Sequence, residues 1–203
     1  MGLACSLTQG VRPTIAMIYG LAEHRHRFAV WAAARAAQRG FTSVERLRGA
    51  LEATSIQSDL RLPATLALQA ASFDEMHRAW CRSICSTLSS WRIKNVAFGR
   101  AAKLVAVYLK TLVLMGGDWD TPLAGSMHPP VDRILLQALA SSDSISSPHK
   151  GEWRRISWTQ LDEMAYYQLI GQLRDVVPLN APFWRIEEYW GRPTPRTCGL
   201  TNG

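Results

Sequence analysis

Hydrophobic residues along this chain recur mostly every three or four positions, the spacing that places side chains on one face of an α-helix. No segment of the sequence shows the strict alternation of apolar and polar residues that is typical of a half-buried β-strand. The periodicity predicts helices over 24–40, 44–55, 73–91, 98–115 and 159–177. Capping boxes, in which Ser or Thr is followed three residues later by Glu or Gln, mark helix starts at 42–45, 72–75 and 157–160.

These segments predict an all-α fold of about seven to nine helices, packed as a single domain over residues 1–190. Such a domain is either one compact body or two lobes with a cleft between them. The connection over 116–130 is long for a compact domain, which is typical of a functional or mobile loop. The Pro- and Gly-rich segment 191–203 predicts a flexible C-terminal tail.

Composition and charge narrow the class of protein. The 203 residues are 47% hydrophobic and 19% charged, which is typical of a globular chain and excludes a disordered one. The net charge of +7 favours a polyanionic partner such as nucleic acid. The longest apolar run, 104–115, is too short to span a membrane and contains Lys110, so we expect an intracellular protein, cytoplasmic or nucleoid-associated, without a membrane partner. The first six residues match the loose pattern for myristoylation of Gly2, which short sequences often meet by chance.

The four cysteines do not predict a metal or disulfide framework. Cys5 and Cys198 lie near the two ends of the chain, and Cys81 and Cys85 lie one helical turn apart. His77 extends this pair into a stripe that spans too far along a helix for all three side chains to reach one ion. We therefore expect buried cysteines, and neither a metal site nor another cofactor.

One predicted helix, 98–115, is almost entirely apolar but carries Arg100, Lys103 and Lys110 on a single face. Two interpretations of its lysines remain open. Either their amines reach solvent or a structural ion pair, or burial lowers the pKa of a lysine and makes it a usable amine nucleophile.

The next helix start, in "SMHPPVDRILLQAL" at 126–139, raises a similar choice for Asp132. Proline and an acidic residue are both favoured in the first turn of a helix, so Asp132 fits a structural role. It also lies only 29 residues beyond Lys103. His128, one helical turn earlier, is a candidate to orient the carboxylate or contact a phosphate, or it titrates without a function.

The segment "FGRAAK" followed by "PPVD" resembles the core of the helix-hairpin-helix base-excision DNA glycosylases, and in spacing is nearest to the archaeal 8-oxoguanine DNA glycosylase branch. The resemblance covers roughly residues 73–140. It implies that Lys103 is a Schiff-base nucleophile and that Asp132 assists its deprotonation or stabilises the sugar cation. Gly99 matches the second glycine of the hairpin, whereas Ala97 stands where the family has the first.

The resemblance also implies double-stranded DNA with a flipped base as the partner. Phosphate contacts are then expected from Gly99, Arg100, Lys110, His128, Arg25, Arg27 and Lys94. The candidates to line a base pocket are Phe28, Trp31 and Trp80. The alternative is a non-catalytic basic helical protein that binds nucleic acid or a protein partner. The sequence leaves open which base is removed, whether the strand is also nicked, and the oligomeric state.

Overall fold

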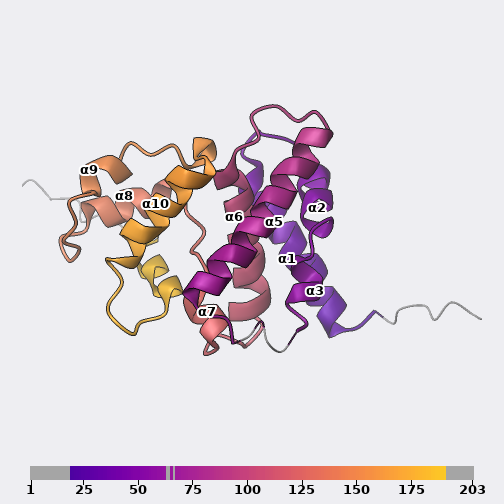
Figure 1. Cartoon of the computed structure of the whole chain (residues 1–203), viewed down its shortest axis with the longest axis horizontal. Helices are drawn as coiled ribbons and strands as arrows, with labels where there is room; N and C mark the ends of the chain where they lie inside the picture. The colour runs from indigo at the N-terminus through magenta and orange to yellow at the C-terminus, as the bar shows by residue number, and fades with distance from the viewer. Residues whose placement is uncertain (1–18, 63–64, 66, 191–203) are drawn as a thin grey trace, which may run out of the picture.

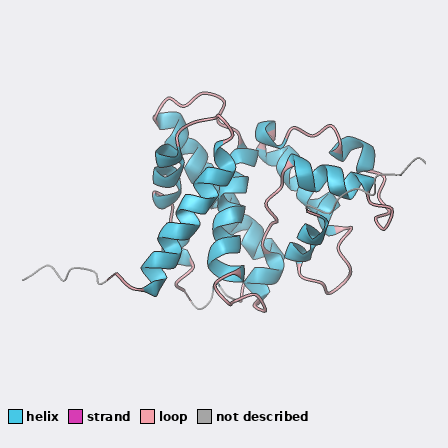
Figure 2. Cartoon of the chain, turned by 180° about the vertical axis from the view of Figure 1, so that it is seen from behind, coloured by secondary structure: helices cyan, strands magenta, loops and turns pink. Residues whose placement is uncertain are grey.

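The computed structural model describes residues 19–62, 65 and 67–190, and every regular element in these ranges is a helix (Figure 1, Figure 2). The expected all-α fold is therefore confirmed. The α-helices are α1 (Leu21–Gln38), α2 (Val44–Glu52), α3 (Ile56–Asp59), α5 (Ala70–Ser90), α6 (Phe98–Leu109), α7 (Pro122–Ser126), α8 (Arg133–Ser141), α9 (Lys150–Trp153) and α10 (Glu163–Arg174). A π-helix, η1 (Lys110–Leu114), continues α6, and 3₁₀ helices form η2 (Trp158–Gln160) and η3 (Phe183–Tyr189).

Helix α6 lies at the centre of the fold. Ten of its twelve residues are buried, and it packs against α1 and α5 on one side and against η2 and α10 on the other. Helices α8, α9 and α10 lie beside this group (Figure 1). One continuous hydrophobic core joins both parts, from Ala33 in α1 through Leu104 in α6 to Ile170 in α10. A division into two lobes is therefore not confirmed.

Small side chains set the close packing of α1 on α6. Ala29, Ala33 and Ala37 follow one another at four-residue spacing and are fully buried. Alanine keeps the helix backbone intact while it lets a neighbouring helix approach closely. The same spacing leaves the opposite face of α1 to larger polar and aromatic side chains.

The predicted helix starts are only partly confirmed. Ser43 caps α2 by accepting a hydrogen bond from the backbone N–H of Arg46, one residue beyond the Thr42 that the capping box indicated. The predictions at 72–75 and 157–160 are wrong, because α5 begins earlier, with Gln69 as its N-cap, and α10 begins later, with Asp162 as its cap. Residues 158–160 form η2 instead. Tertiary packing around η2 overrides the local capping signal there.

Two further segments differ from the sequence prediction. The helix expected over 98–115 changes at Lys110 from α to π geometry, which is a common feature of functional sites. Within the long connection over 116–130, Thr121 caps the short helix α7 by accepting from the N–H of Ala124. The connection is therefore partly ordered as a helix and leads directly to Asp132.

No helix among the described residues combines the length and the apolar character needed to cross a membrane. The predicted flexible tail over 191–203 and the myristoylation pattern around Gly2 lie outside the described residues, as do Cys5 and Cys198.

Gly99, at the start of α6, is explained by packing. A Cβ atom at this position would lie 2.0 Å from the carbonyl oxygen of Trp158, a contact that no side chain tolerates. The backbone N–H of Gly99 donates to the carbonyl of Leu161 at 3.0 Å. The amide that the resemblance assigned to a DNA phosphate is therefore already used within the protein.

We predict that Gly99→Ala lowers the free energy of unfolding by about 2–3 kcal/mol, because η2 must move away from α6 to admit the methyl group. The matched control is Gly171→Ala in α10, where an added Cβ meets no atom within 4 Å. That substitution is expected to raise stability by about 0.5–1 kcal/mol through helix propensity. Urea unfolding followed by circular dichroism measures both, and equal effects would contradict the packing explanation.

Candidate active site

Asp132 has two roles, one for each carboxylate oxygen. As the N-cap of α8, its Oδ1 accepts a hydrogen bond of 2.9 Å from the backbone N–H of Leu135. Its Oδ2 accepts a hydrogen bond of 2.7 Å from the Nζ of Lys103. The helix cap therefore fixes the rotamer that directs the second oxygen toward α6. The structural and the functional interpretations of Asp132 are compatible.

Lys103 lies in the second turn of α6, and its side chain is 7% exposed, against 4% for that of Asp132. Its Nζ also lies 5.3 Å from the ring centre of Trp158. Burial lowers the pKa of the Lys103 amine, the hydrogen bond and charge of Asp132 partly offset this, and the charge of Arg39 lowers it further. The result is an amine that loses its proton more readily than an exposed lysine.

The Lys103–Asp132 pair forms part of the wall of a pocket of about 490 Å³. Residues of α1, α6, η1, α8 and η3 surround it, together with Met115, Pro130 and Trp190. Its charged lining residues are Arg35, Arg39, Lys103, Lys110, Asp132 and Glu187. Four cations against two carboxylates give this pocket a positive potential, which attracts an anionic ligand.

Lys110 and Glu187 form a second ion pair, between η1 and η3. The Nζ of Lys110 also lies 5.4 Å from the ring centre of Trp190. Burial raises the pKa of Glu187, an effect that the hydrogen bond from Lys110 partly offsets. Both residues also line a neighbouring, mainly apolar pocket of about 520 Å³ that includes Trp119 and Trp184. The pair thus lies where the two pockets adjoin.

A polar network, fully buried at His128 and partly exposed at Asp74 and Arg174, supports the segment that precedes Asp132. Both terminal nitrogens of Arg174 donate to the carboxylate of Asp74, at 2.8 and 2.6 Å. His128 bonds Asp74 through Nε2 at 2.8 Å and Tyr166 through Nδ1 at 3.0 Å, which assigns the proton to Nε2. The side chain of His128 has no exposed surface, so it orients the 128–132 segment and does not reach a phosphate.

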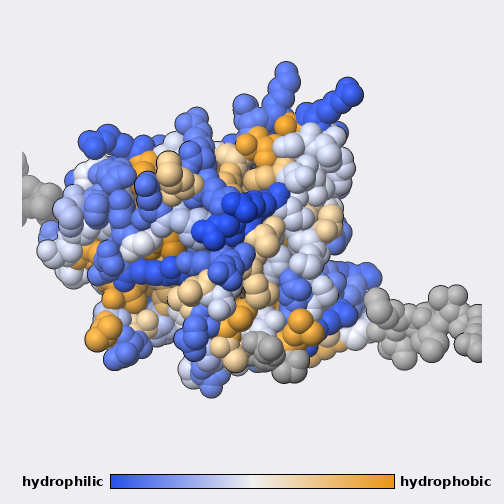
Figure 3. Space-filling model, in the orientation of Figure 1, coloured by the Kyte–Doolittle hydropathy of each residue, from blue (hydrophilic) through white to orange (hydrophobic). Residues whose placement is uncertain are grey.

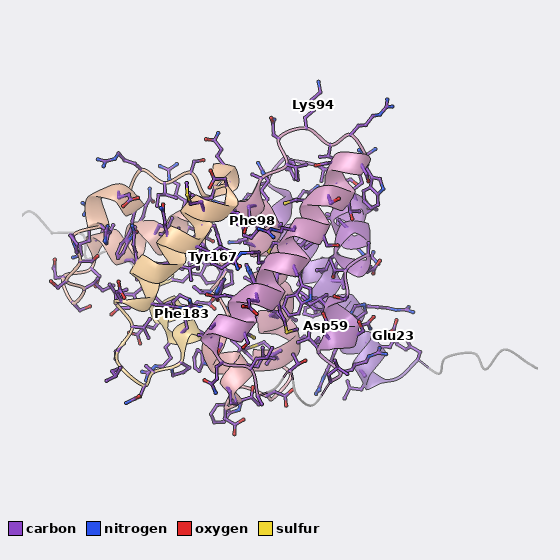
Figure 4. The ribbon with its side chains drawn as sticks, in the orientation of Figure 1. Glu23, Asp59, Lys94, Phe98, Tyr167 and Phe183 are labelled. Carbon is purple, nitrogen blue, oxygen red and sulfur yellow. The ribbon has the colours of Figure 1, made fainter. Side chains whose placement is uncertain are left out.

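His77 extends the network on its inner side. Its ring lies 4.4 Å from that of His128, and its Nδ1 bonds the hydroxyl of Tyr167 at 2.9 Å. Figure 4 shows Tyr167 beside Phe98, between α10 and α5. Burial lowers the pKa of both histidines and raises that of Cys81. Among the described residues, no three His, Cys, Asp or Glu side chains are grouped to hold a metal ion.

The other predicted phosphate contacts are dispersed. Arg25, Arg27 and Lys94 are exposed, but Arg27 is paired with Glu23, and Lys94 points outward from the loop between α5 and α6 (Figure 4). Arg100 stacks on Phe41 at 4.3 Å, and burial lowers its pKa. Of the residues proposed for DNA contact, only Lys110 lines the pocket beside Lys103.

The aromatic residues expected in a base pocket are not in this pocket. Trp80 lies in the core, where its indole N–H donates to Asp59 at 2.8 Å. Phe28 and Trp31 are half-exposed on α1, away from the pocket lining. Trp190 lines the pocket instead. The sequence signal for Trp190 was weak, because an aromatic cluster near a chain end is also typical of core packing.

Comparison with known protein families, with curated proteins and with solved structures finds no match to this chain. The likeness to helix-hairpin-helix glycosylases is therefore limited to the residues quoted above. The site itself combines a buried amine and a carboxylate at a positively charged pocket.

The Asp74 network predicts a specific dependence of stability on pH. Burial alone would raise the pKa of Asp74, but hydrogen bonds from Arg174 and His128 outweigh it and hold the pKa well below its usual range. A carboxylate with a depressed folded-state pKa stabilises the protein above the unfolded pKa, near 4, and loses this contribution as pH falls.

We therefore predict that the free energy of unfolding falls from pH 4 to pH 2 and that Asp74→Asn makes this fall shallower. At pH 7 the variant should be about 3 kcal/mol less stable, because Arg174 loses its charge partner. Asp143→Asn, at an exposed position, is the control and should follow the wild type. Chemical unfolding at each pH measures these free energies. If they fell equally steeply from pH 4 to pH 2 in Asp74→Asn and in the wild type, the assignment to Asp74 would be contradicted.

Proposed function

We propose that the chain is a DNA glycosylase with associated lyase chemistry, in which Lys103 is the nucleophile and Asp132 its acid–base and electrostatic partner. The observation that carries the proposal is the 2.7 Å contact between these two buried side chains on the wall of a cationic pocket. The spacing of "GRAAK" and "PPVD" gives independent support.

The environment of Lys103 suits nucleophilic catalysis. An amine attacks only when unprotonated, and burial shifts the equilibrium of Lys103 in that direction. The Oδ2 of Asp132 accepts a hydrogen bond from the amine, so it is positioned to take up the proton that the amine loses. After it passes this proton to the departing base, the same carboxylate stabilises positive charge that develops on the sugar.

The proposed reaction runs at C1′ of the deoxyribose. The lone pair of Nζ forms a bond to C1′ while the bond from C1′ to the base nitrogen breaks, and the base leaves with that electron pair and takes up a proton. The C1′–O4′ bond of the sugar then opens with its electron pair on O4′, which takes up the remaining Nζ proton, and this leaves a C=N imine between C1′ and Lys103. In the lyase step, loss of a C2′ proton to water eliminates the 3′ phosphate and cleaves the strand. Hydrolysis of the imine by water then returns the free amine.

The pocket suits an extruded nucleotide in size and chemistry. Its volume of about 490 Å³ lies within the range of small-molecule sites. Met115 and Trp190 offer apolar surface for a base, and Arg35 and Arg39 offer cationic groups for flanking phosphates. All four line the same pocket as the Lys103–Asp132 pair.

We predict that the protein releases a base from at least one duplex in a panel that carries oxidised, deaminated or alkylated bases. Lys103→Gln and Asp132→Asn should each lower the single-turnover rate by about 10²–10⁴-fold. Asparagine keeps the N-cap of α8, but Asp132→Asn leaves the buried Lys103 ammonium without its charge partner, so we expect this variant to be less stable and its rate is measured below its melting temperature. Lys110→Gln is the matched control for loss of a pocket lysine, and its rate should fall less.

Equal losses in the Lys103 and Lys110 variants would show only that the pocket needs positive charge. Salt-sensitive DNA binding without base release from any duplex of the panel would instead support a non-catalytic binding protein. Chromatography of the released bases and melting curves of each variant separate these outcomes from misfolding.

The rate should also depend on pH in a defined direction. Because the free amine attacks, we predict a rate that rises with pH and levels off above the pKa of Lys103, which burial lowers from 10.5. Asp132 raises that pKa, so in Asp132→Asn the rise should move to lower pH while the plateau falls. Single-turnover rates between pH 5 and pH 10 measure both changes. A profile that is the same in the two proteins would contradict the coupling.

A further inference from the structure

Three side chains on the exposed face of α1, together with Arg39, its C-cap, form a stripe. Phe28, Trp31, Arg35 and Arg39 follow one another at spacings of three, four and four residues, which keeps them on one side of a helix. The first two are aromatic and the last two are cationic. The cationic end lines the Lys103 pocket, whereas the aromatic end lies beyond it.

The aromatic end is a platform of large exposed rings. Phe28 is 54% and Trp31 is 49% exposed, which is unusual for such side chains next to a fully buried alanine face. Their ring centres lie 5.9 Å apart with an angle of 33° between the planes. To admit a flat group between them, the two rings would have to lie about 7 Å apart, so a base would stack on their outer surface instead.

The cationic end carries arginines without partners. Neither Arg35 nor Arg39 has an ion pair or a side-chain hydrogen bond with any described residue. Arg39 has a φ of +37°, in the left-handed region that non-glycine residues rarely adopt. Over residues 21–39 there are four arginines and one glutamate, so this side of the molecule repels cations and attracts a polyanion.

We infer that α1 is a track for a single DNA strand, along which an unpaired base stacks on Phe28 and Trp31 and the adjoining phosphates lie against Arg35 and Arg39. Stacking platforms beside a cationic groove are the usual means of holding single strands. A protein partner that buried the aromatic pair would leave the two arginines unmatched unless it were also acidic, so a polyanion with flat apolar bases fits the stripe better.

The dimensions set the register of the strand. Arg39, the C-cap of α1, lies eight positions beyond Trp31, which at the rise of an α-helix is about 12 Å. This corresponds to roughly three or four nucleotides at the phosphate spacing of a stacked strand. The base on the platform is therefore distinct from the nucleotide in the pocket. It follows that the protein prefers DNA opened over several nucleotides to a fully paired duplex.

The test compares binding of the full-length protein to a fluorescein-labelled 15-mer of oligo(dT) and to a fully paired 15-base-pair duplex, both unmodified. We expect Trp31→Leu to weaken oligo(dT) binding about 10-fold, Trp31→Phe to restore most of it, and duplex binding to change less than threefold. Arg35→Gln should weaken both and lower the salt slope for oligo(dT) by about 0.7, whereas Trp31→Leu should leave the slope unchanged.

Trp91→Leu is the matched control, because Trp91 is also partly exposed but follows α5 and lies against α2. Its affinity for oligo(dT) should equal that of the wild type. Equal affinities for wild type and Trp31→Leu, or equal losses in Trp31→Leu and Trp31→Phe, would overturn the stacking platform. A shift from dimer to monomer in Trp31→Leu, seen by light scattering, would assign the stripe to self-association and overturn it as well.

The inference extends the proposed function but is tested separately from it, because binding of unmodified DNA requires no base release. If Trp31→Leu bound oligo(dT) as tightly as the wild type, the strand track would be wrong, but the proposed Lys103–Asp132 chemistry would not be affected. Conversely, if the protein released no base but showed the expected pattern of DNA affinities, the proposed glycosylase activity would be wrong and the strand track on α1 would still be supported.

Discussion

The structure depends on the burial of one positive charge. Lys103 lies in a helix that is otherwise almost entirely apolar, and a buried ammonium without a partner would destabilise the fold by several kcal/mol. Asp132 supplies that partner from the start of α8, so the constraint fixes the position of α8 against α6. Because α8 also needs its cap, the same carboxylate serves two helices at once.

Several other features support this contact. The network of Asp74, Arg174 and His128 holds the segment leading to Asp132, and it ties α5 to α10 at the same time. Gly99 lets η2 approach the first turn of α6, which brings Trp158 near the amine of Lys103. On the face of the molecule shown in Figure 3, hydrophilic residues predominate and hydrophobic residues form scattered patches, in contrast with this interior arrangement. A buried ion pair is weak evidence for stability alone, and its position at a pocket makes it a candidate functional site.

Local patterns in the sequence predict the fold class, whereas the pairing of Lys103 with Asp132 is expected from the resemblance to the helix-hairpin-helix glycosylases. Helical periodicity identifies α6, and the Pro-Val-Asp helix start identifies Asp132, only 29 residues from Lys103. The rest of the site depends on contacts between distant segments. Arg174 meets Asp74 across 100 residues, and Glu187 meets Lys110 across 77, with no local signal for either. Trp80 and Trp190 show the same limit, since composition does not tell a core indole from one that lines a pocket.

The most direct measurement is reductive trapping on a duplex that carries one abasic site. Its aldehyde reacts with a suitably placed amine whichever base the protein normally removes. The chain has only four lysines, at 94, 103, 110 and 150, so mass spectrometry of the borohydride-reduced adduct identifies the residue. A covalent adduct on Lys103, absent from Lys103→Gln and retained in Lys110→Gln, is the predicted result. No adduct, or one on another lysine or on the N-terminal amine, would contradict the assignment of Lys103 as the nucleophile.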